Sequence, residues 1–183
     1  MQYERCALVA SKSGSPGHSS EIPGPSDPAP LEDLTKLVPE WDLSGLSPTG
    51  WDLGESRTDA MSDHVDLAPS LARMTFNQAF VHRDASASIY GKRLVYGGHV
   101  QGLAQASLSR LLPGLATIVA WDGCDHIGPA FEGDLLKFRH ELKEILPVNG
   151  GRLMRFEIRG ATTTEQESSD SDILVWTPIV FAP

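Results

Sequence analysis

One helical pattern followed by a run of strand patterns most constrains the fold of this chain. At residues 98–112, apolar side chains recur at close to the 3.6-residue period of an α-helix, with Ala, Ser and Gly between them. Strand patterns follow at 115–120, 135–146, 153–159 and 173–181, and the middle two alternate apolar with charged residues. One long helix before a run of antiparallel strands predicts an α+β domain in which the sheet wraps around the helix.

Turn and breaker residues mark the ends of several elements. A Pro-Gly pair ends the long helix, and Pro178 interrupts the last strand, which suits an edge strand or a bulge. Residues 68–77 carry a weaker helical pattern. Residues 84–88 can form a short helix that has Asp84 as its N-cap and is closed by Gly91.

The N-terminal part of the chain differs in composition from the rest. Residues 6–10 form a short apolar strand pattern, whereas residues 11–30 are rich in Ser, Gly and Pro and predict a flexible linker. Scattered Leu, Val and Trp at 31–51 indicate an arm that wraps the domain. We therefore expect a strand remnant and linker at 1–30 and a single folded domain at 31–183.

The charge balance excludes several classes of partner. The chain has 24 acidic and 15 basic side chains, for a formal charge of -9, so nucleic acids and anionic membranes are unfavourable partners. No apolar run approaches the roughly 20 residues of a membrane span, and no signal peptide is evident, so we expect a cytoplasmic protein. Cys6 and Cys124 are then expected as free thiols.

A proton-transfer group and exposed backbone donors occur close together in the sequence. His82 follows Asn77 by five residues, and Gly97 and Gly98 open the long helix. An imidazole exchanges protons near neutral pH, and the N–H groups at a helix start favour a negatively charged oxygen. Asn77 could orient a water, so the group suits hydration of an α,β-unsaturated thioester. A structural histidine and a simple tight turn remain open alternatives.

Four segments together resemble a known family. They read Asn-Gln-Ala-Phe-Val-His-Arg-Asp at 77–84, Tyr-Gly at 90–91, Leu-Val-Tyr-Gly-Gly-His-Val at 94–100 and His-x-Gly-Pro-x-Phe-x-Gly-Asp at 126–134. In this order they resemble the MaoC-like hot-dog dehydratases, most of all the second repeat of the mesaconyl-CoA hydratase (β-methylmalyl-CoA dehydratase) branch. The resemblance covers residues 41–161. It implies a hot-dog fold, in which an antiparallel sheet wraps one long central helix.

The resemblance also implies an activity and a site. The chain would be a hydro-lyase acting on a short or branched acyl-CoA, with the CoA thioester as substrate and no further cofactor. His82 would be the catalytic imidazole, Asn77 its polar partner, and Gly97 and Gly98 the thioester-binding donors. Well-known hydratases of the family have an aspartate where this chain has Asn77, so their two-base scheme does not transfer. Tyr96 stands where many members have a histidine.

Other polar groups have weaker assignments. Arg83, Lys92 and Arg93, with Lys137 and Arg139, are the local cations that could bind CoA phosphates, although ordinary solvated charges are an equal alternative. The acidic and histidine residues at 63–66 and 122–126 lack a recurring metal-ligand spacing, so we expect no metal. We expect His126 at a strand end, lining the pocket opposite the helix.

The resemblance leaves the assembly open. Members of the mesaconyl-CoA hydratase branch carry two hot-dog repeats, and this chain resembles only the second. We therefore expect a homodimer, or a hetero-oligomer with another hot-dog subunit. The alternatives to an enzyme that acts alone are a non-catalytic subunit that completes a partner's acyl-CoA tunnel and, third, a thioesterase. The spacing from Asn77 to His82 argues against the thioesterase.

Overall fold

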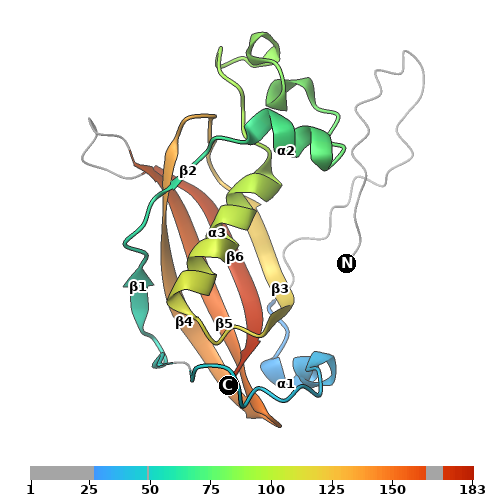
Figure 1. Cartoon of the computed structure of the whole chain (residues 1–183), viewed down its shortest axis with the longest axis vertical. Coiled ribbons are helices and arrows are strands. Elements are labelled where there is room, and N and C mark those ends of the chain that lie inside the picture. The colour runs from blue at the N-terminus through green and yellow to red at the C-terminus, as the bar shows by residue number, and fades with distance from the viewer. Residues whose placement is uncertain (1–26, 49, 164–170) are drawn as a thin grey trace.

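The computed structural model of the protein describes residues 27–48, 50–163 and 171–183. The strand pattern at 6–10 and nearly all of the linker lie outside the described residues, so the division of the chain near residue 30 stays a prediction. The rest is an antiparallel sheet curved around one helix (Figure 1). The expected hot-dog α+β fold is therefore confirmed.

Four long strands and two short ones make up the sheet. The long ones are β3 (Thr117–His126), β4 (Leu135–Val148), β5 (Gly151–Thr163) and β6 (Ser171–Ala182). They are ordered β4-β5-β6-β3, and β1 (Ser56–Thr58) and β2 (Asp63–His64) both pair with the outer side of β4. All pairings are antiparallel. Within the described residues, β3 pairs only with β6, so it is an edge strand.

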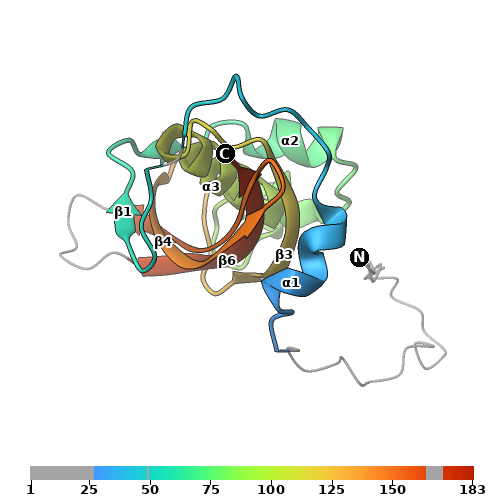
Figure 2. The same ribbon diagram turned by 90° about the horizontal axis from the view of Figure 1, so that it is seen from below.

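The helix α3 (Gly97–Leu111) lies in the concave side of this sheet, as the end-on view in Figure 2 shows. Ala104 and Ser107 are fully buried, and these small side chains let the helix approach the strands closely. Larger side chains fill the space around them, and fully burying one of that size stabilises the fold by about 1.5–3 kcal/mol. Those with no exposed surface include Leu108, Leu112, Phe138, Phe156 and Trp176.

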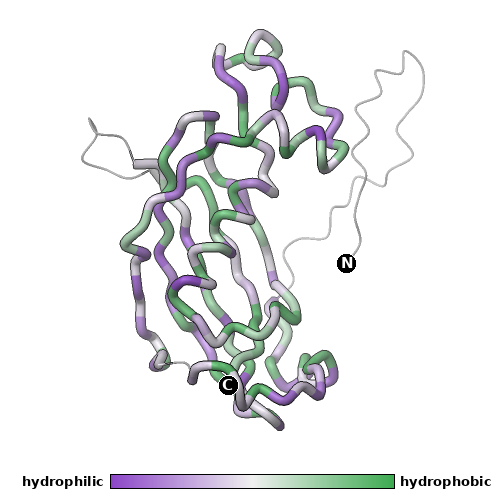
Figure 3. The backbone as a smooth tube through the Cα atoms, viewed as in Figure 1, coloured by the Kyte–Doolittle hydropathy of each residue, from purple (hydrophilic) through white to green (hydrophobic). Residues whose placement is uncertain are grey.

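A second, smaller core lies on the other face of the sheet. The arm before Trp51 contains the short helix α1 (Leu31–Leu34) and the 3-10 helix η1 (Thr35–Leu37). Its buried leucines pack against apolar residues of β5 and β6; the cluster is Leu31, Leu43, Leu153, Ile179 and Phe181. Hydrophobic residues recur along the long strands of the sheet, whereas β1 at the sheet edge is more hydrophilic (Figure 3). The arm thus packs against the sheet, as the sequence predicts.

Most predicted strands are shorter than the observed ones. β3 continues six residues past the predicted end at 120, and its pairing with β6 shifts register between Trp121 and Cys124. Pro178 lies opposite Trp121 at the start of this irregularity. It therefore sits in an interior strand beside a bulge, where its missing N–H is tolerated. The edge-strand alternative for Pro178 is wrong and the bulge alternative is correct.

An irregular segment crosses the end of the sheet at the start of α3 (Figure 1). It contains α2 (Ala68–Met74), three residues shorter than predicted, and the 3-10 helices η2 (Phe80–His82) and η3 (Ala85–Ala87). The predicted Asp84 cap is present, because its carboxylate accepts the Ser86 N–H at 2.9 Å. This segment brings His82 to the helix start.

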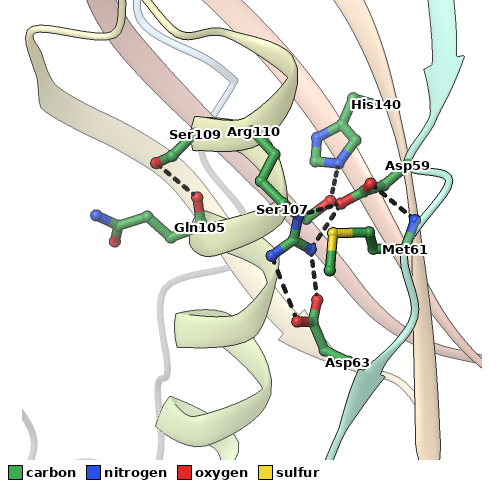
Figure 4. Close-up of polar contacts among 8 residues, drawn as sticks. All are labelled: Asp59, Met61, Asp63, Gln105, Ser107, Ser109, Arg110 and His140. Carbon is green, nitrogen blue, oxygen red and sulfur yellow. Dashed lines mark hydrogen bonds and ion pairs between the residues drawn. The ribbon is translucent and has the colours of Figure 1, made fainter.

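A buried polar network attaches α3 to the sheet (Figure 4). The Asp59 carboxylate, which is 4% exposed, accepts hydrogen bonds from the Ser107 hydroxyl and the Arg110 guanidinium. Arg110 also pairs with Asp63 at 2.6 Å. Since the Ser107 proton goes to Asp59, the Ser107 oxygen accepts from Nε2 of His140, 2.8 Å away. His140 is thus neutral, with its proton on Nε2.

Acid should destabilise the fold through His140. Burial lowers the pKa of His140 from the ordinary 6.5 to about 4. Between these values His140 is protonated in the unfolded chain but not in the native state, so the free energy of unfolding falls as pH drops from about 6.5 to 4. The loss attributable to His140 is on the order of 3 kcal/mol. Denaturant unfolding at successive pH values measures it.

The control is His140→Gln, which keeps a donor for Ser107 but cannot titrate. Its stability should fall less than that of the wild type over the same pH range. Equal pH dependence in the two proteins would contradict the assignment.

Candidate active site

A cavity of about 370 Å³ opens at the N-terminal end of α3. Its wall includes two imidazoles, those of His82 and His126, and the first helical residue, Gly97. Most of the remaining wall is apolar and includes Val100 and Ile173. The structure therefore brings His82 and Gly97, both predicted site residues, to one cavity.

A backbone carbonyl fixes the tautomer of His82. Nδ1 of His82 lies 2.8 Å from the carbonyl oxygen of Leu94. Because a carbonyl oxygen can only accept, Nδ1 must carry the proton and donate it. The lone pair is then on Nε2, the nitrogen that a general base uses. The Leu94 N–H in turn donates to the Val81 carbonyl at 3.0 Å, which ties the two segments together from both sides.

The carbonyl that holds His82 belongs to a well-anchored strip of chain. Leu94 forms a β-bridge with Phe131, and the Val95 N–H donates to the Ala130 carbonyl at 2.8 Å. Residues 130–131 follow β3, so this strip joins the His82 side of the cavity to the side reached by β3. A short path of backbone hydrogen bonds therefore connects the segments that hold the two imidazoles.

The start of α3 offers backbone donors to the cavity. Tyr96 is the N-cap, and no side chain hydrogen-bonds to this helix end. The first N–H groups of a helix have no partner within it, and they carry the positive end of its dipole. Gly97 is part of the cavity wall, whereas Gly98 is not among the wall residues and lies against the Tyr96 ring. A Cβ on Gly98 would sit 2.6 Å from that ring.

His126 approaches Gly97 very closely. A Cβ on Gly97 would lie 2.6 Å from Nε2 of His126, so only glycine allows this contact. His126 is exposed as a residue, but partial burial of its ring lowers its pKa, and Asp125 only partly offsets this. Cys124 is the nearest polar partner, with its Sγ 4.0 Å from Nε2. Burial raises the pKa of the Cys124 thiol to about 11, so the thiol stays protonated and His126 stays neutral at pH 7.

Asn77 is placed differently from His82. Its side-chain oxygen accepts the Ala79 N–H at 2.9 Å, and its own N–H donates to the Ala72 carbonyl. These bonds shape the turn that leads from α2 to η2, and Asn77 is not among the residues that line the cavity. Phe76, beside it, has a positive φ of 56°. A role for Asn77 as the polar partner of His82 stays a prediction.

The candidate cations lie next to cavity residues in the chain but do not line the cavity. Arg83 donates to the Gln78 carbonyl at 3.1 Å. Arg93 pairs with Glu132 at 2.8 Å. Lys92 lies over the Phe131 ring, 5.7 Å from its centroid. Their assignment to CoA phosphates stays a prediction.

In the part of the chain that the structure describes, no group of three or more His, Cys, Asp or Glu residues is placed to hold a metal ion. No described helix is long and apolar enough to cross a membrane. His126 was expected to line the pocket, and the structure places it there, but its contact with Gly97 was not foreseen from the sequence.

Two curated proteins are similar to this chain in sequence. A protein of Cereibacter sphaeroides named mesaconyl-CoA hydratase is 30% identical over 154 residues, which is 75% of this chain and 43% of that protein. A protein of Chloroflexus aurantiacus named beta-methylmalyl-CoA dehydratase is 27% identical over 173 residues, covering 82% and 47% of the two chains. The chain thus spans about half the length of these relatives. No protein-family model matches the chain.

Solved structures show the same fold. A conserved hypothetical protein of Mycobacterium tuberculosis, Rv0216, described as having a double hot-dog fold, matches with a TM-score of 0.71 and 32% identity. The match covers 94% of this chain and 54% of that one. A MaoC domain protein dehydratase of Chloroflexus aurantiacus matches with a TM-score of 0.70 and 17% identity, over 94% and 56% of the chains. The family resemblance inferred from four short segments is thereby confirmed.

Replacing Gly97 with alanine should displace His126. Gly102 lies on the same helix with nothing within 4 Å of its Cβ position. Gly102→Ala should therefore raise the free energy of unfolding by about 0.5–1 kcal/mol, the usual gain when alanine replaces glycine inside a helix. Gly97→Ala should lack this gain, because the new methyl group overlaps the imidazole. NMR of the histidine ring protons, with chemical unfolding, measures both effects. An equal gain in stability with unchanged His126 resonances would contradict the contact.

Proposed function

We propose that this chain, a homologue of mesaconyl-CoA hydratase with the fold of the MaoC-like hot-dog dehydratases, adds or removes water across the double bond of an α,β-unsaturated acyl-CoA. The hydratase and dehydratase names of its relatives support a hydro-lyase at the level of the family. The observation that carries the proposal is one cavity lined by both His82, whose Nδ1 is held by the Leu94 carbonyl, and the helix start at Gly97.

His82 is the proton-transfer group in this proposal. In the hydration direction, Nε2 takes a proton from water while the water oxygen bonds to the β-carbon and the double-bond electrons move towards the thioester oxygen. The imidazolium then delivers that proton to the α-carbon, which restores both the carbonyl and the neutral imidazole. Asn77 cannot accept a proton as a base, so one residue both removes and returns it. Dehydration is the same sequence reversed.

Gly97 is the electrostatic partner of His82. Negative charge collects on the thioester oxygen when water adds, and a backbone N–H at a helix start stabilises it without reorganising. The apolar walls near Val100 and Ile173 suit a short or branched acyl chain, since a volume of about 370 Å³ is small for a ligand pocket. Arg83, Lys92 and Arg93 are the cations we assign to the CoA phosphates, and no cofactor besides the CoA thioester is required.

A second hot-dog domain completes the assembly in this proposal. β3 is an unpaired edge among the described strands, and such edges in natural proteins are covered or blunted. A groove of about 630 Å³ runs beside it, lined by residues 115–121 and by Gln101, Gln105 and Ser109 of α3. The similar mycobacterial protein is a double hot-dog, of which this chain covers 54%. A second copy of this chain is the simplest occupant, and a separate hot-dog subunit is the alternative.

The oligomeric state tests the partner. We expect light scattering to give twice the 19.8 kDa mass of one chain. Adding bulk and charge to the groove with Gln105→Arg and Ser109→Arg should weaken the dimer. Ala106→Arg is the matched control, because Ala106 is exposed on the same helix but does not line the groove. A monomer at tens of micromolar, or equal masses for both variants, would contradict the homodimer.

Loss of enoyl absorbance on incubation with crotonyl-CoA or mesaconyl-CoA tests the activity. His82→Ala should lower the rate about 100- to 10,000-fold, the usual contribution of a general acid–base. Its melting temperature should change little, because the lost hydrogen bond to Leu94 contributes only about 1 kcal/mol. His64→Ala, at an exposed histidine of β2, is the control that should keep full activity.

Other outcomes separate the alternatives. Activity that appears only after a second hot-dog subunit is added would favour the subunit that completes a partner's tunnel. Release of free CoA without hydration would favour a thioesterase. A large loss of melting temperature in His82→Ala would show that His82 is mainly structural.

A further inference from the structure

The cavity contains a second imidazole that the proton-transfer scheme does not use. His126 comes from the last position of β3 and lines the cavity beside the start of α3. The three ring atoms of His126 nearest to Gly97 lie 2.6–3.0 Å from the Cβ position of that glycine. The imidazole therefore lies directly over the residue to which we assign the thioester oxygen.

The ring edge that faces Gly97 carries a nitrogen. Nε2 is the closest atom, and among the described residues its nearest hydrogen-bond partner is the Cys124 sulfur at 4.0 Å, which is the outer limit for such a bond. Nε2 is thus available to a ligand in the cavity. A hydrogen on Nε2 would lie close to Gly97, whose own backbone N–H is at the start of α3.

The charge state of His126 suits a hydrogen-bond donor rather than a general acid. Burial lowers the pKa of His126, so the imidazole is neutral at pH 7 and holds one N–H. The groups around it are the carboxylate of Asp125, which partly opposes this shift, and the protonated thiol of Cys124. A neutral imidazole can polarise a carbonyl without giving up its proton, as in enzymes that use a neutral histidine as electrophile.

We infer that His126 is a second catalytic residue, whose Nε2–H donates a hydrogen bond to the thioester oxygen beside the N–H of Gly97. This inference rests on the proposed function of the cavity. Two donors then share the charge that develops on the oxygen when water adds at the β-carbon. Greater stabilisation of that oxygen lowers the demand on proton transfer, which suits a site that has an asparagine where related hydratases have a carboxylate.

Substitutions at His126 separate donation from packing. His126→Phe keeps a ring over Gly97 but removes the donor, and removing one oxyanion donor lowers kcat on the order of 100-fold or more. His126→Gln restores an N–H near the Nε2 position and should recover part of the loss. Both variants should keep the wild-type melting temperature, because the side chain makes no strong hydrogen bond within the described protein.

A chromophoric thioester reports polarisation without turnover. The absorbance of 4-dimethylaminocinnamoyl-CoA shifts to longer wavelength when its carbonyl oxygen receives hydrogen bonds. We expect this shift on binding to wild type and to His82→Ala, a smaller shift with His126→Gln and almost none with His126→Phe. The probe is titrated with purified full-length protein in its native oligomeric state.

Each result supports or overturns the inference. An unchanged absorbance shift of the probe and an unchanged kcat in His126→Phe would overturn the inference about His126. If His82→Ala still lost hydration in that case, the proposed function would stand. Equal inactivity of the Phe and Gln variants with lowered melting temperatures would make His126 a structural residue and also overturn it. A wild-type protein that neither hydrates enoyl-CoA nor shifts the probe would overturn the proposed function, and this inference with it.

Discussion

The burial of α3 in the concave side of the sheet determines where the chemistry can occur. Small residues such as Ala104 and Ser107 let the strands approach the helix, and large side chains of the strands close the space around it. A helix held this way exposes its first N–H groups at one end of the sheet. The polar network around Asp59 and Arg110 holds the other end of the helix and adds ion pairs to the apolar packing. The site is thus a product of how the core is built.

The two histidines of the cavity have different hydrogen-bonding environments. His82 donates from Nδ1 to a fixed carbonyl, which leaves the lone pair on Nε2. His126 lies against Gly97, and although the residue as a whole is exposed, partial burial of its ring lowers its pKa, so it is neutral at pH 7 with one N–H to donate. The same side chain can therefore serve as base on one wall and as donor on the other. This division follows from the local hydrogen bonds and the burial of each ring.

Sequence patterns predicted the elements that depend on local periodicity. The helix differed by one residue at each end, and the four long strands were all found because their alternation or apolar runs are local signals. The full length of β3 was missed because Trp121 and Cys124 flank a register shift that breaks its alternation. The position of Asn77 and the contact between His126 and Gly97 depend on how distant segments pack. No spacing in the chain reports such contacts, although the motif around His126 indicated that it faces the pocket.

The two ends of the ten-residue strand β3 lie in different environments. Its first residues line the groove beside α3, its outer edge is unpaired in the described chain, and its last residue is the imidazole over Gly97. Residues 124–126 pair with residues 174–176 of β6, whereas the stretch before them is interrupted by register shifts. The strand therefore connects the edge where a partner would bind to the side chain over Gly97, with a bulge between them. If a partner at the edge changed the position of His126, thermodynamic linkage would require occupancy of the cavity to change the affinity for that partner by the same factor.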